Sequence, residues 1–195
     1  MSTGTKSTSG VAAAVAGGFT SVCCMPNTTP CLDSAPLVEF VRLRAREAGL
    51  SRVFVAAAAT VGRAGEQLAP MASMKHAGAV AFTDDGDGIA SAQMMLRVLQ
   101  MAKVVGCPFM QHCQDHQLAE GGVMNEGPTA TCLGLLPWPR EAEEIMLERD
   151  VRLNRGPRAR YHAQHLSSGG SAEIIRRARA EGLPVSGEVS PHHLL

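Results

Sequence analysis

Segments typical of β-strands and of α-helices alternate along almost the whole chain. Each expected strand is a short apolar run, and each expected helix carries apolar residues at helical spacing. Six strands are expected, at residues 19–25, 52–59, 79–82, 109–115, 160–165 and 184–189. Helices are expected at residues 11–16, 35–48, 66–75, 91–105, 140–152 and 171–180. This alternation predicts an α/β fold with a parallel sheet, either doubly wound or closed as a (β/α)8 barrel.

Polar residues follow nearly every expected strand, which favours the barrel. They occur at residues 26–30, 84–87, 112–115, 165–168 and 192–193. A barrel places its functional residues at the carboxyl ends of many strands, whereas a doubly wound sheet uses one crevice. A complete barrel needs eight strands and about 250 residues. We therefore expect residues 1–195 to form a single, partial barrel domain with about six of the eight strand–helix units.

Composition excludes several classes of partner. Eighteen basic and eighteen acidic residues cancel, so neither nucleic acid nor an anionic membrane is an expected partner. The apolar run at residues 11–16 is too short to cross a membrane. Six cysteines without a CxxC pair indicate a reduced, cytoplasmic protein. A basic run is expected to be a solvated helix end and loop: Arg149, Arg152, Arg155, Arg158 and Arg160.

Three strand ends carry residues that bind metals in other proteins: Asp85, His112 and His165. Imidazole and carboxylate groups suit Zn²⁺, and a bound metal lowers the pKa of a coordinated water toward neutrality. Each residue also has a structural alternative. A histidine beside a strand end is often a hydrogen-bonded structural group, and Asp84 and Asp87 are candidates for capping the next helix.

Four stretches, in the same order along the chain, carry a family resemblance. They are GGFTSVCCMPNTTP (17–30), AFTDDGDG (81–88), QHCQDHQLAEGGVMNEG (111–127) and YHAQHLSSGGSAEIIRRARAEGLPVSGEVSPHHLL (161–195). Together these stretches resemble class I dihydroorotase, a member of the amidohydrolase superfamily. The resemblance implies an amidohydrolase-type (β/α)8 barrel that interconverts N-carbamoyl-L-aspartate and L-dihydroorotate in de novo pyrimidine biosynthesis.

The resemblance also implies a role for four residues. Asp85 resembles the catalytic carboxylate that bridges two zinc ions, and His112 and His165 resemble ligands of the second zinc. Asn27 in the MPNT motif resembles a contact to the substrate. The complete protein is expected to be a homo-oligomer, with aspartate transcarbamoylase as a further partner.

Departures from the family pattern leave alternatives open. Gln114 stands where many members have glutamate. The family's HxH motif and terminal aspartate have no counterpart here, so we expect an internal fragment that binds metal weakly and is nearly inactive alone. A non-catalytic scaffold subunit of aspartate transcarbamoylase is one alternative function. Another cyclic amidase, such as an allantoinase, is a second, although related hydantoinases bridge their metals with a carboxylated lysine and the strand before Asp85 offers none.

Overall fold

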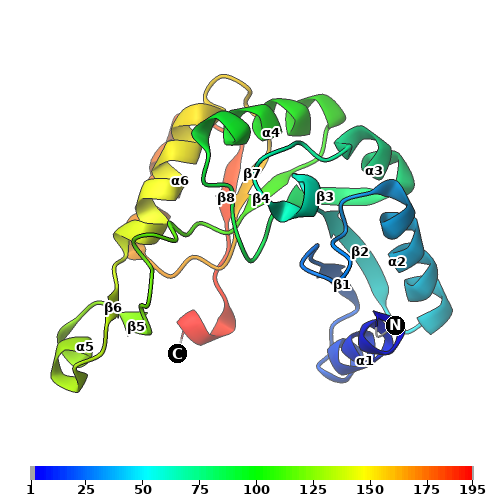
Figure 1. Cartoon of the computed structure of the whole chain (residues 1–195), viewed down its shortest axis with the longest axis horizontal. Helices are drawn as coiled ribbons and strands as arrows, with labels where there is room; N and C mark the ends of the chain where they lie inside the picture. The colour runs from blue at the N-terminus through cyan, green and yellow to red at the C-terminus, as the bar shows by residue number, and fades with distance from the viewer. Residues whose placement is uncertain (1–2, 195) are drawn as a thin grey trace.

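The computed structural model describes residues 3–194, and its centre is one curved, six-stranded parallel sheet (Figure 1). The strands are neighbours in the order in which the chain forms them, β1-β2-β3-β4-β7-β8. Their bounds are Ser21–Cys24, Arg52–Ala57, Ala79–Thr83, Phe109–Gln111, Tyr161–Ala163 and Val185–Gly187. Every expected strand is therefore present. Five are shorter than expected, and β3 extends one residue further, to Thr83.

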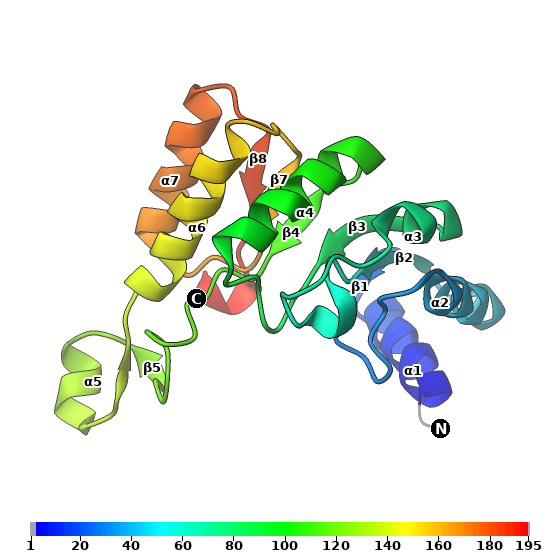
Figure 2. The same ribbon diagram turned by 45° about the horizontal axis from the view of Figure 1, so that its top comes forward.

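Apart from the first, the helices that accompany the sheet cover its convex face (Figures 1 and 2). The six helices are α1 (Thr3–Ala16), α2 (Ala35–Ala48), α3 (Met71–Ala77), α4 (Ala92–Val105), α6 (Glu141–Asn154) and α7 (Gly169–Ala180). Helix α1 lies beside α2 near the first strand. A doubly wound sheet would carry helices on both faces and would reverse its strand order. Sequential order with helices outside is the architecture of an incomplete (β/α)8 barrel, as the sequence predicted.

The hydrophobic core lies between the convex face of the sheet and these helices. Phe82, Phe109 and Tyr161 point from neighbouring strands into this layer and are fully buried. On the concave face, by contrast, Phe54 is 44% exposed, although its neighbour Val55 is fully buried. Successive strand residues point to opposite faces, so the core and the concave face draw on alternate positions of the same strands.

Three local expectations were wrong at helix starts. Residues 3–10, expected to be irregular, belong to α1. Helix α3 begins at Met71 rather than residue 66, because Thr60 pairs with Leu68 in a short bridge and Pro70 precedes the first turn. Helix α7 begins at Gly169 rather than residue 171, because the Ser168 hydroxyl caps it by accepting a hydrogen bond from the Gly170 amide.

The long connection expected at residues 116–140 forms an arm that projects from the body of the molecule (Figures 1 and 2). It contains the two-residue strands β5 (Met124–Asn125) and β6 (Pro137–Trp138) and the short helix α5 (Pro128–Leu133) between them. The two strands pair in parallel. Two 3₁₀ turns, η1 (Val61–Arg63) and η2 (Pro191–His193), complete the elements of residues 3–194.

Within residues 3–194, no helix has both the length and the apolar character needed to cross a membrane.

Candidate metal centre

Asp85, His112 and His165 come together at the carboxyl ends of three neighbouring strands. Asp85 follows β3, His112 follows β4 and His165 follows β7 by two residues. One ligand atom from each side chain lies within 4.8 Å of the other two. Parallel strands deliver their ends to the same edge of a sheet, which explains how residues 80 positions apart in the chain meet.

The separations of the three donor atoms suit a single metal ion. His112 Nδ1 lies 3.1 Å from His165 Nε2, which lies 3.4 Å from Asp85 Oδ1. His112 Nδ1 and Asp85 Oδ1 are 3.8 Å apart. Two ligands of a tetrahedral Zn²⁺ with bonds of about 2.05 Å are separated by about 3.3 Å. The donor set and its spacing therefore fit a zinc ion, and the site contains the residue types that zinc prefers.

The three side chains shift one another's pKa values. The hydrogen bond with His165 lowers the pKa of Asp85, against an opposing effect of burial. The same contact raises the pKa of His165. Burial lowers the pKa of His112, which keeps this imidazole neutral. A neutral imidazole and an ionised carboxylate are the protonation states in which these groups bind metals.

Gln114 fixes the orientation of the His112 ring. The Gln114 Oε1 atom lies 2.8 Å from His112 Nε2 and accepts its hydrogen bond. Since a carbonyl oxygen only accepts, the proton of the neutral ring stays on Nε2, and the Nδ1 lone pair faces the other two ligands. The departure from the family's glutamate thus keeps an acceptor at this position.

The adjacent residues Asp84 and Asp85 have different roles, because Asp84 is not part of the candidate metal centre. Asp84 is fully buried, and its Oδ1 atom accepts hydrogen bonds from the amides of Ala59 and Thr60 at 2.9 and 3.1 Å. Its other oxygen accepts the Thr60 hydroxyl. Asp84 therefore joins the ends of β2 and β3. The expectation that it caps the next helix is wrong, because the Ser91 hydroxyl accepts the Met94 amide at the start of α4.

Asn27, the expected substrate contact, lies beside the same carboxylate. Its Nδ2 atom is 3.4 Å from Asp85 Oδ2, the oxygen that does not face the histidines. The Asn27 residue is exposed, on the loop that follows β1. The structure thus brings all four residues named from the sequence to one place.

Arg63 is a residue of this region that the sequence did not single out. Its guanidinium donates to the backbone oxygen of Asp85 and pairs with the Asp87 carboxylate at 3.0 Å. Asp87, like Asp84, does not cap α4. Arg63 lies in the turn η1, and its main partner is a backbone atom, so nothing in the residue types indicated the contact.

His162, on β7 and three positions before His165, has other partners and does not join the centre. Its Nδ1 atom lies 2.8 Å from Ser186 Oγ, and its Nε2 atom lies 3.4 Å from Glu188 Oε2. His165 leaves the strand with a backbone φ of +35°, an unusual value for a residue other than glycine. That local turn carries its ring to the ligand cluster.

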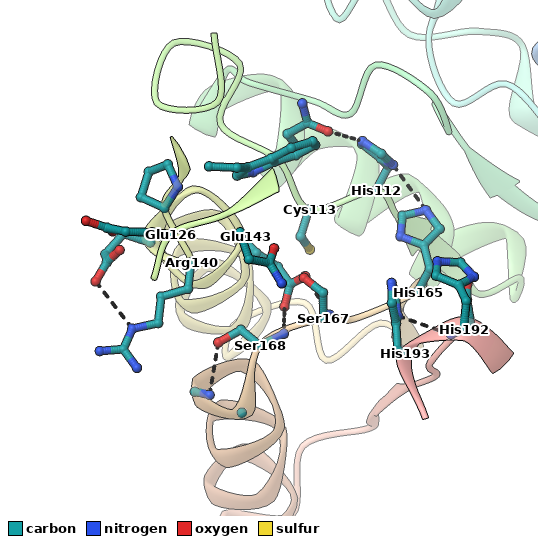
Figure 3. A pocket seen from close by; sticks show the side chains of 18 residues that line it. His112, Cys113, Glu126, Arg140, Glu143, His165, Ser167, Ser168, His192 and His193 are labelled. Atoms are coloured by element: carbon teal, nitrogen blue, oxygen red, sulfur yellow. Dashed lines mark hydrogen bonds and ion pairs between the residues drawn. The ribbon is translucent and has the colours of Figure 1, made fainter. Parts of the chain in front are cut away.

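An open cavity of about 1180 Å³ begins at the two histidines and runs beneath the arm (Figure 3). Glu126 and Arg140 line it from the arm, and His192 and His193 line it from the C-terminal turn. The cavity is large enough for a small polar ligand, and the metal-ligand cluster stands at its edge.

Solved structures with this arrangement define the class of the fold. L-Hydantoinase (dihydropyrimidinase) from Arthrobacter aurescens matches with a TM-score of 0.73 and 18% identity, over 93% of this chain and 42% of that one. Dihydropyrimidinase from Brevibacillus agri matches with a TM-score of 0.66 and 20% identity, over 95% of this chain and 42% of that one. The fold is part of a (β/α)8 barrel like that of these two structures.

Sequence comparison identifies the family within that class. A family model described as Dihydro-orotase-like matches residues 2–171, and the chain belongs to this family. A dihydroorotase from Caldanaerobacter subterraneus subsp. tengcongensis is 47% identical over 185 residues, and one from Syntrophobacter fumaroxidans is 46% identical over 184. This chain spans 43% and 42% of the lengths of these two relatives.

Proposed function

We propose that this chain is part of a zinc-dependent dihydroorotase, which interconverts N-carbamoyl-L-aspartate and L-dihydroorotate in the cytoplasm for pyrimidine biosynthesis. The convergence of Asp85, His112 and His165 on one point, with donor separations of 3.1 to 3.8 Å, carries the proposal. Relatives named dihydroorotase support the choice of reaction.

Asp85, His112 and His165 would hold zinc, with the Asp85 carboxylate bridging two ions in the complete site. Bound zinc would supply an activated water for attack on the ring amide and would polarise its carbonyl. The chain's own contribution is to keep the Asp85 carboxylate ionised and the His112 ring neutral. Gln114 holds the His112 ring in the tautomer that leaves Nδ1 free.

Asn27 would recognise the substrate. Its side-chain amide lies next to the Asp85 carboxylate. Asn27 is on an exposed loop, so a ligand at the carboxyl ends of the strands can reach it. An amide donor suits a carboxylate or ring carbonyl, and dihydroorotate carries both. The reactive centre and the binding group would then lie on either side of Asp85.

The aspartate at position 85 favours dihydroorotase over the other cyclic amidases considered. Asp85 and the buried Asp84 follow the third strand, and neither this strand nor the turn after it contains a lysine. A carboxylate bridge needs no carbamate from carbon dioxide. Zinc loading should therefore be insensitive to bicarbonate.

Metal binding by the 195-residue chain tests the site directly. The chain is stripped of metal and titrated with Zn²⁺ against a chromophoric chelator, together with Asp85→Asn and His165→Gln. Binding that both substitutions weaken at least about tenfold supports the site. His162→Gln is the matched control, since His162 pairs with Ser186 and Glu188 instead. Equal affinity in all four proteins would reject the site.

Activity is tested on the protein extended to the length of its curated relatives. Its zinc content and its hydrolysis of L-dihydroorotate, allantoin and hydantoin are measured side by side. We expect two zinc ions per chain and a preference for dihydroorotate. A preference for allantoin would indicate a different cyclic amidase. A folded protein without turnover that binds aspartate transcarbamoylase would indicate the scaffold function.

A further inference from the structure

Three side chains of helix α6 contact the segments that carry the candidate ligands Asp85, His112 and His165. We propose that Glu143, Arg149 and Asp150 are positioning residues that set the spacing of the candidate metal ligands. This inference rests on the proposed function, because that proposal makes Asp85, His112 and His165 metal ligands.

Glu143 holds the segment that follows His165. Its Oε2 atom accepts the Ser167 amide at 2.8 Å and the Ser167 hydroxyl at 2.9 Å, and its Oε1 atom accepts the Ser168 amide at 3.1 Å. Figure 3 shows the carboxylate aimed at both serines. The residue is 9% exposed. It therefore anchors the backbone just after the unusual φ of His165, at the start of α7.

Arg149 holds the segment that follows Asp85. Its guanidinium donates to the backbone oxygens of Ile89 and Ala90, the first at 2.7 Å. These residues end the turn that begins at Asp85. The expectation that Arg149 belongs to a solvated basic run is wrong for this reason, since only 23% of its side chain is exposed.

Asp150 holds the strand residue next to His112. Its Oδ2 atom accepts Gln111 Nε2 at 3.1 Å and the Tyr161 hydroxyl at 3.0 Å, and its Oδ1 atom pairs with Arg149 at 2.7 Å. The carboxylate is completely buried. It thus joins β4, β7 and the Arg149 anchor behind the ligand cluster.

Two buried carboxylates, Glu143 and Asp150, and the partly buried Arg149 are unusual for a helix that only packs on a sheet. A buried ion pair generally contributes less stability than apolar residues of the same volume. Here each charged group binds a different segment that carries a candidate ligand. All three groups lie on one helix of fourteen residues. Because one helix carries all three groups, it ties the three segments to one another, and the 3.1 to 3.8 Å donor separations depend on how these segments are placed.

Hydrogen exchange of backbone amides in the metal-free chain tests each anchor separately. The variants are Glu143→Gln, Arg149→Met and Asp150→Asn. We expect exchange to become about tenfold faster only at residues 167–170, 88–91 and 111–114, respectively, because local opening is governed by local contacts. Glu148→Gln is the control: Glu148 lies on α6 but pairs with Arg177 at the surface and should change none of these segments. Should Asp150→Asn not fold, Gln111→Met removes its strand contact and keeps the Arg149 pair.

Cobalt binding by the same variants completes the test, read from visible absorption in competition with a chelator. Each anchor variant should lose about tenfold in affinity and show altered cobalt bands, whereas Glu148→Gln should match the parent. Unchanged exchange, or exchange that quickens uniformly across the sheet, would overturn the proposal. Local quickening with parental cobalt affinity would also overturn it. If the parent binds no metal, the proposed function fails, and the exchange pattern alone decides whether α6 holds these segments.

Discussion

His165 Nε2 lies 3.4 Å from Asp85 Oδ1, and each residue shifts the pKa of the other toward the charged form. The pair therefore stabilises the metal-free fold only while both groups are charged. Its effect on stability should therefore depend on pH.

The sign of that dependence follows from the two shifts. His165, raised from 6.5, contributes stability that is complete below 6.5 and is lost as pH rises through its folded pKa. Asp85, lowered from 3.8, contributes stability above 3.8 that is lost as pH falls through its folded pKa. Asp85→Asn should thus destabilise the metal-free chain most near about pH 5 and least near about pH 9. Partial exposure limits the effect to about 1 kcal/mol. Urea unfolding at both pH values measures it, and an equal loss at both would contradict the assignment.

Gln114 should control metal affinity through the tautomer of His112. Gln114→Ala removes the acceptor 2.8 Å from Nε2, so the ring proton is no longer confined to that nitrogen. We expect about tenfold weaker zinc binding, the usual cost of losing a partner of a metal-binding histidine. Gln114→Glu restores the family's carboxylate acceptor and should bind at least as tightly as the parent. Chelator competition measures both, and weaker binding by the glutamate variant would contradict this role.

Substitution of Asp84 should mainly lower stability, whereas substitution of Asp85 should mainly weaken metal binding. Asp84→Asn replaces one of two accepting oxygens by an NH2 donor, inside a fully buried site where the amides of Ala59 and Thr60 and the Thr60 hydroxyl all donate to the carboxylate. We expect a loss of about 2 kcal/mol or more in the free energy of unfolding. Asp85→Asn should instead weaken zinc binding at least about tenfold at a small cost in stability. Asp87→Asn, at an exposed ion pair with Arg63, serves as the control and should change stability by less than about 1 kcal/mol.

The parts of the structure that the sequence revealed are those with local or periodic causes. Helix α2 was predicted at residues 35–48 and spans Ala35–Ala48, because its apolar spacing, Pro36 and Gly49 all agree. The ligand cluster was also predictable, since strand ends in a barrel share one edge.

The anchors behind the ligand cluster were not predictable from residue types. Arg63, Glu143 and Arg149 bind backbone atoms, and every residue of the chain supplies such atoms. Charge alone made Arg149 look solvated. Tertiary contacts also decided the start of α3, where a bridge from Thr60 to Leu68 replaced the expected first turn.

Gly88 offers the sharpest test of how closely the Asp85 turn packs against His112. A Cβ atom at Gly88 would lie 2.6 Å from the backbone oxygen of His112, and the residue has a φ of +72°. Gly65 has nearly the same φ, +70°, but open space around it. Gly65→Ala should cost about 1 kcal/mol from backbone strain alone. Gly88→Ala should cost at least about 1 kcal/mol more, since the His112 backbone must shift. It should also weaken zinc binding, which Gly65→Ala should leave intact. Urea unfolding and chelator competition on both variants measure the difference, and equal behaviour would show that the Asp85 turn does not set the position of His112.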